Sequence, residues 1–397
     1  MTSAGRATPR GAFVLVVGTL VGLHACMAAT RVAATLAVLA QGFPEWTVGA
    51  LLSLYGLAPI VLSMWAGRMA DRHGFHRPVR LAAAAALAGA VLPVVTQHIV
   101  ALAASGLLTG GAVAFAAVAI QREAGQMARD PDDLKRVFSW VALGPALSNT
   151  FAPVITGLLI DHAGYRTAFA FGALLPLVAL ACAARVPPAT PPGDSTLREA
   201  ARGGGAMELW RIPTLRNLML VNVAMAASWD AHSFTVPVVG HVRDYSASAI
   251  GLVLASFAMA ATVIRLVITG LAHRIDERRS LVAAISVASF ALLVYAWLPG
   301  VAGMMAGSAL LGLALGSVQP MVLSMLHQSA PEGRQGQALG LRMLFTNVAT
   351  IAMPVGFGFL AAATTSAAPM WLMAAALLLA LGPARRLRRQ CRSEPKA

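Results

Sequence analysis

Twelve apolar stretches of about twenty residues follow one another along the chain, separated by short polar breaks. A helix needs roughly 20 mostly apolar residues to cross a bilayer. Apolar and polar residues do not alternate with a period of two, and open sheets cannot span lipid, so we expect helices. The predicted spans are residues 12–38, 46–66, 79–97, 99–121, 137–160, 166–185, 214–239, 247–271, 281–298, 302–326, 337–362 and 367–384. The pattern therefore predicts an all-α membrane protein with twelve transmembrane helices.

The composition supports this prediction and excludes a water-soluble fold. Hydrophobic residues make up 58% of the 397 residues, charged residues only 12%, and the mean hydropathy is +0.71. A soluble domain carries about 25% charged residues, so lipid must cover part of this surface. The net charge of +14 does not indicate nucleic-acid binding, because the basic residues lie in short clusters between apolar stretches. The first apolar stretch is too long for a signal peptide, so we expect it to be retained.

The distribution of arginine and lysine predicts the orientation of the chain. With the N-terminus placed in the cytoplasm, the inner segments carry 26 of the 30 basic residues. The outer loops then carry Arg166 and Arg243, and the remaining two basic residues lie within spans. Because basic residues concentrate on the cytoplasmic side, we expect both termini there, in a bacterial inner membrane.

The longest polar stretch divides the chain into two halves. Residues 187–213, PPATPPGDSTLREAARGGGAMELWRIP, are rich in proline, glycine and charge, as linkers are. We therefore expect an N-terminal six-helix bundle at 1–186, a cytoplasmic linker at 187–213 and a C-terminal six-helix bundle with a basic tail at 214–397.

The break GRMADRHGFHRPVR, residues 67–80, recurs in weaker form in the second half. A shift of 202 residues places Asp71 and Arg72 on His273 and Arg274, in the break TGLAHRIDERR. Two related six-helix halves are typical of transporters that rock one bundle against the other.

This break resembles the loop signature of the major facilitator superfamily, G-x-x-x-D-R-x-G-[RK]-[RK], at Gly67, Asp71, Arg72, Gly74 and Arg77. The segment IDHAGYRTAF, residues 160–169, is similar to the family's D-x-x-G-[WY]-R-x-x-F segment, and VALGPALSNTFAP loosely resembles its helix-five motif. The resemblance covers the whole chain. It implies two pseudo-symmetric six-helix bundles and transport by alternating access.

The resemblance also implies a gating role for this break. Asp71 would meet the N-terminal end of a helix in the other half, near Arg342, when the cytoplasmic side is closed, since an acidic group is favourable there. We expect Asp71 and Arg72 to carry gating, with Gly67 and Gly74 allowing a tight turn. The alternative is a basic loop that only orients the protein in the membrane.

Charges well inside the spans, away from their ends, are candidates for function, and we single out three, Arg31, Asp230 and Arg265. The 202-residue shift places Arg31 on Ser233, less than one helical turn from Asp230. Either Arg31 binds an anionic or polar group while Asp230 supplies a proton-dependent partner, or the two form a salt bridge that closes the outer gate. For Arg265 we favour a structural role at the gating end.

Neutral polar residues inside the spans are weaker candidates. His24 shares a helix face with Arg31 and is either a cavity residue or a hydrogen-bonded helix contact. Asn149, Gln319 and Asn347 each either line the cavity or bond a neighbouring helix. His232 cannot face Asp230 on a regular helix, so a packing or gate role is expected for it.

These residues predict a secondary transporter. No nucleophile–base pair, metal-ligand spacing or phosphate-binding loop is present, so we expect neither an enzyme nor a cofactor or metal. The overall resemblance favours a monomer that exports a small organic compound in exchange for protons. The alternative is uptake of an organic anion, motivated by Arg31 and the scarcity of acids in the spans. The span at 99–121 lacks an arginine that drug–proton antiporters of the superfamily often carry, and the motif in the span at 137–160 is incomplete; both departures weaken the case for proton antiport of drugs. A channel or a sensor is the further alternative.

Overall fold

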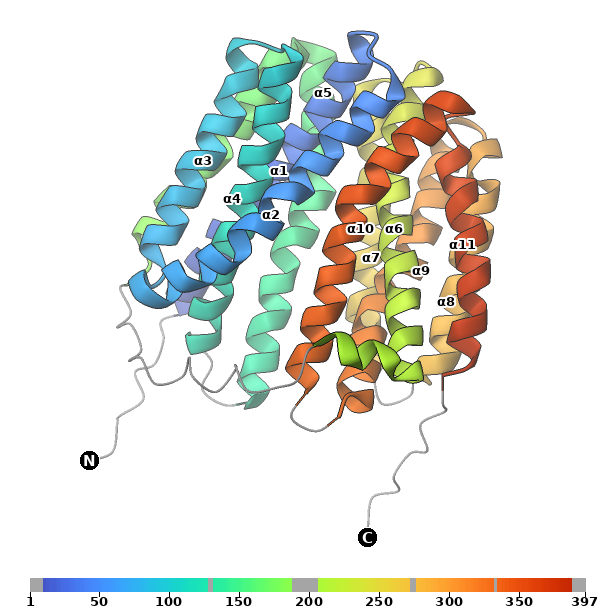
Figure 1. Cartoon of the computed structure of the whole chain (residues 1–397). Helices are drawn as coiled ribbons and strands as arrows, with labels where there is room; N and C mark the ends of the chain where they lie inside the picture. Colours follow the sequence, from blue (N-terminus) through green and yellow to red (C-terminus); the bar gives the residue numbers. More distant parts are fainter. Residues whose placement is uncertain (1–9, 128–130, 188–205, 272–275, 332–333, 388–397) are drawn as a thin grey trace, which may run out of the picture.

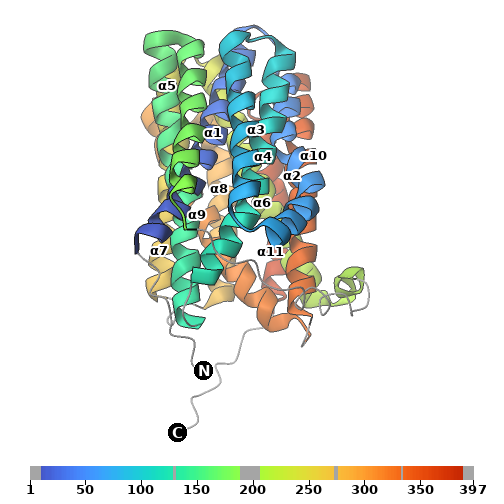
Figure 2. The same ribbon diagram turned by 90° about the vertical axis from the view of Figure 1, so that its left-hand side faces the viewer.

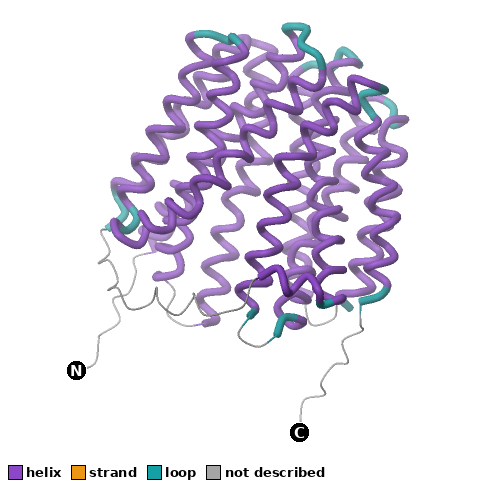
Figure 3. Tube along the Cα trace, in the orientation of Figure 1, coloured by secondary structure: helices purple, strands orange, loops and turns teal. Residues whose placement is uncertain are grey.

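The computed structural model describes residues 10–127, 131–187, 206–271, 276–331 and 334–387, which are helical apart from short turns (Figures 1 and 3). The helices are α1 (Arg10–Ala40), α2 (Glu45–His73), α3 (His76–Val95), α4 (Ile99–Met127), α5 (Pro131–Ala184), α6 (Pro213–Val242), α7 (Ala247–Leu271), α8 (Glu277–Val294), α9 (Gly300–Ser329), α10 (Gln335–Ala363) and α11 (Ala368–Arg385). Two short 3-10 helices are η3 (Ala206–Arg211) and η5 (Tyr295–Trp297).

Each of the twelve predicted spans coincides with helix. The spans at 137–160 and 166–185 both lie in α5, which breaks at Gly164, where φ is +78°. Glycine adopts a positive φ without steric cost, so the chain reverses direction at this residue. In the described part of the chain, nine helices are long and apolar enough to cross a membrane, and α5 contributes a 45-residue stretch. The predicted all-α membrane fold is confirmed.

The break after the second span differs from the prediction. Gly67 lies inside α2, which continues to His73, so Gly67 does not form part of a turn. The reversal needs only Gly74, which has a φ of +65° and whose N–H donates to the carbonyl of Ala70 at 2.9 Å. The backbone of Asp71 lies in the last turn of α2, but the side chains of Asp71 and Arg72 lie outside what the structure describes.

The helix that was expected to meet Asp71 also begins at a different residue from the one predicted. The helix expected to begin near Arg342 begins at Gln335, which places Arg342 two turns inside α10. The guanidinium of Arg342 donates to Oδ1 of Asn222 in α6 at 3.3 Å. Arg342 therefore joins α10 to α6.

Helices α1–α5 pack mainly against one another, and helices α6–α11 do the same (Figures 1 and 2). We call these sets the first and the second group. Residues 188–205 of the expected linker between them lie outside the described residues. The groups meet chiefly along two helix pairs, α2 with α10 and α5 with α7, and less extensively where α6 meets α1 and α2.

The closest contacts between the groups lie at one end of the bundle. We call this the far end; α1 ends and α2 begins there, whereas α1 begins and α11 ends at the near end (Figure 1). A Cβ atom on Gly49 would clash with the carbonyl of Pro354, and one on Gly157 with the carbonyl of Ala247. Glycine therefore lets the backbones of the two groups touch, as small residues do in membrane helix packing.

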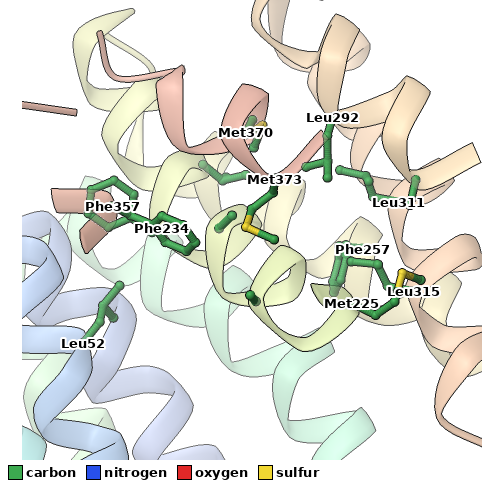
Figure 4. Close-up of a cluster of buried hydrophobic side chains, with 14 of the residues drawn as sticks. Leu52, Met225, Phe234, Phe257, Leu292, Leu311, Leu315, Phe357, Met370 and Met373 are labelled. Carbon is green, nitrogen blue, oxygen red and sulfur yellow. The ribbon is translucent and has the colours of Figure 1, made fainter. Parts of the chain in front are cut away.

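The apolar core continues from one group into the other. Leu52 of α2 belongs to the same buried cluster as Phe234 of α6 and Phe357 of α10 (Figure 4). In the second group the cluster extends through Met373 of α11 to Leu292 of α8. This packing fixes the helices that carry the central polar residues.

Candidate functional site

A cavity of about 200 Å³ lies between the two groups. Four helices line it, α1 and α2 from the first group and α6 and α10 from the second. Its polar lining residues are Arg31, Tyr55, Asp230, Ser233, Asn347 and Thr350. The cavity thus brings together the two charged residues that the repeat had placed at corresponding positions.

Arg31 lies on the less buried face of α1. His24, Met27 and Arg31 are half-buried, whereas every residue between them is buried. Residues three, four and seven apart share one face of a helix, so these side chains form a stripe. The stripe explains why a helix in the middle of the fold carries a charge.

Arg31 and Asp230 interact electrostatically across the cavity without forming an ion pair. Among the described residues, no nitrogen–oxygen distance of 4.0 Å or less joins them. In the same part of the chain, Oδ2 of Asp230 and Oη of Tyr55 are buried and have no hydrogen-bond partner. Two of the residues that line the cavity thus each carry a buried oxygen without a hydrogen-bond partner in the described part of the chain.

A second, smaller cavity of about 40 Å³ adjoins the first. Arg31 and Ser233 line both, and α5 and α7 supply the other walls, including Asn149 and Phe257. Asn149 also donates to the carbonyl of Pro145 in its own helix at 2.9 Å. Asn149 thus lines a cavity, whereas its hydrogen bond remains within α5.

His232 lines the smaller cavity and begins a chain of hydrogen bonds. Its Nε2 lies 2.8 Å from Oγ of Ser308, which lies 2.7 Å from the hydroxyl of Tyr295. Its ring stacks on Phe257 with centroids 4.2 Å apart. Sequence reasoning proposed only packing or a gate for His232, because nothing in the sequence relates α6 to positions so distant in α9 and η5.

Arg265 extends from α7 to α9. Its guanidinium donates to Oε1 of Gln319 at 3.1 Å and to the carbonyl of Gly316 at 3.4 Å, and it lies 5.8 Å from the ring centre of Trp229. These contacts join α7 to α9 and α6, and the structural role expected for Arg265 stays a prediction. They also place Gln319 in contact with Arg265 rather than in the lining of either cavity.

The remaining candidates occupy different positions. Asn347 lines the larger cavity together with Thr350. His24 lines neither cavity, and its Nδ1 has no hydrogen-bond partner in the described part of the chain. Arg77 is exposed at the start of α3, directly after the turn at Gly74.

Sequence reasoning missed one residue at the far end. Asp161 precedes the break in α5, and its carboxylate accepts hydrogen bonds from the backbone N–H groups of Ala247 at 2.9 Å and Ser248 at 2.8 Å. It thereby caps the first turn of α7, in the other group. The signal was the segment IDHAGYRTAF, which was recognised without a role for its acid.

The family profile that matches the chain is that of the Major Facilitator Superfamily, over residues 18–306 and 218–396. The chain belongs to the Major Facilitator Superfamily. As a member of this superfamily it is a multi-pass secondary transporter of a small-molecule substrate, and not an enzyme. The resemblance read from residues 67–77 is confirmed.

Individual relatives agree with this membership. The chain is 30% identical over 364 residues to the tetracycline resistance protein, class G, of Vibrio anguillarum, covering 84% of this chain and 85% of that protein. A crystal structure of the nucleoside transporter NupG has a TM-score of 0.71 at 14% identity, covering 95% of this chain and all of that one. A POT family transporter in complex with a thioalcohol-conjugated peptide has a TM-score of 0.70 at 13% identity, covering 93% and 94%. At these identities the two structures show the fold alone.

Proposed function

We propose that this transporter exports a small organic compound in exchange for protons, with the cavity between the groups as its binding site. The observation that carries the proposal is the pair Arg31 and Asp230, which line one cavity from opposite groups without forming an ion pair in the described part of the chain. Export is further supported by the 30% identity to a tetracycline resistance protein. Two features still depart from the drug–proton antiporters that the family resemblance suggested. The motif in the span at 137–160 is incomplete, and the span at 99–121 lacks the expected arginine.

Alternating access gives the two groups their roles. The N-terminal bundle, residues 1–186, would rock against the C-terminal bundle, residues 214–397, around the cavity. With both termini in the cytoplasm of a bacterial cell, the far end faces outward, and the contacts of α2 with α10 and of α5 with α7 close it. The protein would then work as a monomer in the inner membrane, in a state that is closed to the outside.

Asp230 is the residue that would exchange the proton. A carboxylate oxygen without a hydrogen-bond partner is costly inside a bilayer, and Oδ2 of Asp230 has none in the described part of the chain, so Asp230 gains from either a proton or a positively charged group of the substrate. Competition of proton and substrate for one carboxylate is sufficient to couple their movements. Asp71 and Arg72 at the near end would gate the cytoplasmic side.

The test is proton movement in everted membrane vesicles that carry a proton gradient and a pH-sensitive dye. Addition of a transported compound, with tetracycline and ethidium as the first probes, should release protons in vesicles with the wild-type protein. Asp230→Asn should abolish the release. The matched control is Asp244→Asn, because Asp244 lies in a far-end turn with a φ of +56°, which asparagine adopts readily.

Equal proton release by wild type and Asp230→Asn would refute the assignment of Asp230. Uptake of an organic anion remains the second candidate, because Arg31 lines the cavity and acids within the spans are scarce. In that case benzoate, but neither of the first two probes, would move with the gradient, and Arg31→Gln would stop it.

A further inference from the structure

The charges that line the larger cavity balance one another. Arg31 contributes a permanent positive charge from α1, and Asp230 contributes a carboxylate from α6. All other described residues that line this cavity are neutral, and among them Tyr55, Asn347 and Thr350 offer hydroxyl and amide groups. A ligand with a single charge would therefore leave one of the two side chains without a counter-charge.

The two charged side chains do not pair with each other in the described part of the chain. Among the same described residues, Oδ2 of Asp230 has no hydrogen-bond partner. Unpaired charges are expensive in a low-dielectric environment, and removing one partner of a buried pair costs more than the pair gains. The structure therefore favours a ligand that pairs with both charges over one that pairs with either alone.

The size of the cavity restricts the ligand further. An apolar cavity of about 150 Å³ holds one benzene molecule, and the cavity here measures about 200 Å³. It accepts a compact molecule in the closed state and would have to widen for a compound with several fused rings.

We infer that the cavity binds a small zwitterion, a molecule that carries one carboxylate and one protonated amine. The guanidinium of Arg31 pairs with the carboxylate, for which its planar fork is suited, and the carboxylate of Asp230 pairs with the ammonium group. This inference rests on the proposed function, because it assigns a substrate class to the same central site.

The experiment is a thermal-shift titration of the purified full-length protein with matched sets of compounds. Each of leucine, phenylalanine and γ-aminobutyrate is compared with its methyl ester, which keeps only the positive charge, and with its N-acetyl derivative, which keeps only the negative charge. A hydrogen bond to a charged group contributes enough to change affinity roughly tenfold or more. At least one zwitterion should therefore bind about tenfold more tightly than either of its derivatives.

Two variants assign the charges. In Arg31→Gln the zwitterion should bind no better than its ester, and in Asp230→Asn no better than its N-acetyl derivative. Asp244→Asn, which lies outside the cavity, should keep the wild-type order. If either cavity variant fails to fold, the order of affinity of zwitterion, ester and N-acetyl derivative for the wild-type protein still tests whether the cavity binds a zwitterion.

Three results would overturn the inference: an ester that binds best, an N-acetyl derivative that binds best, or no shift with any compound of the three sets. Its failure is separable from that of the proposed function. Proton release with tetracycline or ethidium, without zwitterion binding, would leave proton-coupled export intact and refute the zwitterion. Zwitterion binding without proton-coupled movement would support the zwitterion and refute proton-coupled export.

Discussion

The hydrogen bonds of Asp161 make a quantitative prediction about the far end. Asp161 belongs to α5 of the first group, and its carboxylate accepts from the N–H groups of Ala247 and Ser248 at the start of α7 in the second group. The first N–H groups of a helix have no partner within the helix and carry a partial positive charge. These bonds exist only while the groups touch at the far end. Asp161→Ala should therefore shift the protein toward the state that is open there.

The size of the shift follows from the two bonds. Loss of a side-chain cap costs about 0.5–2 kcal/mol, and Asp161 is exposed, so screening by water keeps its contribution in that range. A loss of about 0.5–2 kcal/mol changes the ratio of two states by a factor of roughly 2–30. Asp161→Asn keeps one acceptor oxygen but loses the charge, so its shift should be smaller.

The assay is a distance measurement between spin labels by pulsed electron resonance. Gln41 and Thr365 are exposed near the far end, one in each group, and can carry the labels once the native cysteines are replaced. Asp161→Ala should increase the population with the longer distance, and Asp161→Asn should fall between Asp161→Ala and the wild type. An unchanged distribution in Asp161→Ala would refute the assignment of these bonds as a closing contact.

The same residue predicts how the far end responds to pH. Asp161 lies between the two spans of α5. Partial burial acts to raise its pKa, but the hydrogen bonds from Ser248, Ala247 and Ser246 outweigh this effect. The pKa of Asp161 is therefore lowered below its ordinary value. A lowered pKa in the closed state means that this stabilisation is complete above the ordinary pKa of about 3.9 and is lost as the pH falls below it. Titration of Asp161 should therefore cause no change in the distance distribution between roughly pH 5 and 8.

Three further predictions concern other parts of the transport cycle. Gly49→Ala should open the far end in the same spin-label assay, because its methyl group would clash with the carbonyl of Pro354; an unchanged distribution would contradict this. Arg31→Ala and Asp230→Ala should each lower transport by roughly tenfold or more, and the double variant should stay inactive in the vesicle assay, whereas recovery of activity would identify the pair as a brace. Asp71→Asn should slow turnover while the protein inserts normally, and wild-type turnover would remove Asp71 from gating.

Much of the fold could be predicted because a bilayer imposes a simple rule. Every spanning segment must satisfy its own backbone, so each apolar stretch of sufficient length becomes a helix. The one merged element, α5, follows the same rule, since Gly164 lets the chain reverse with hardly any loop. Gly67 was misassigned because glycine is compatible with helix as well as turn, and only the reversal at Gly74 shows which one was needed.

The arrangement of the site could be predicted only in part. The repeat placed Arg31 and Asp230 at corresponding positions, and both line one cavity. The chain from His232 through Ser308 to Tyr295 depends on how α6, α9 and η5 pack, and hydrogen bonds between distant segments leave no periodic pattern in a sequence. The cap on α7 was likewise hidden, because a lone acid before a glycine has many possible partners.

The state of the far end bears on the two hypotheses for Arg31 and Asp230. A salt bridge that closes the outer gate should be formed when that gate is closed, since its energy would then favour the closed state. Here α2 meets α10 and α5 meets α7 at the far end, with Asp161 capping α7, yet Arg31 and Asp230 are not within ion-pair distance in the described structure. The closure is thus supported by glycine contacts and a helix cap, which leaves the charged pair available for a ligand. For this reason we favour a binding role for the pair, and the double variant tests it directly, because two residues that only bind cannot compensate for each other's loss.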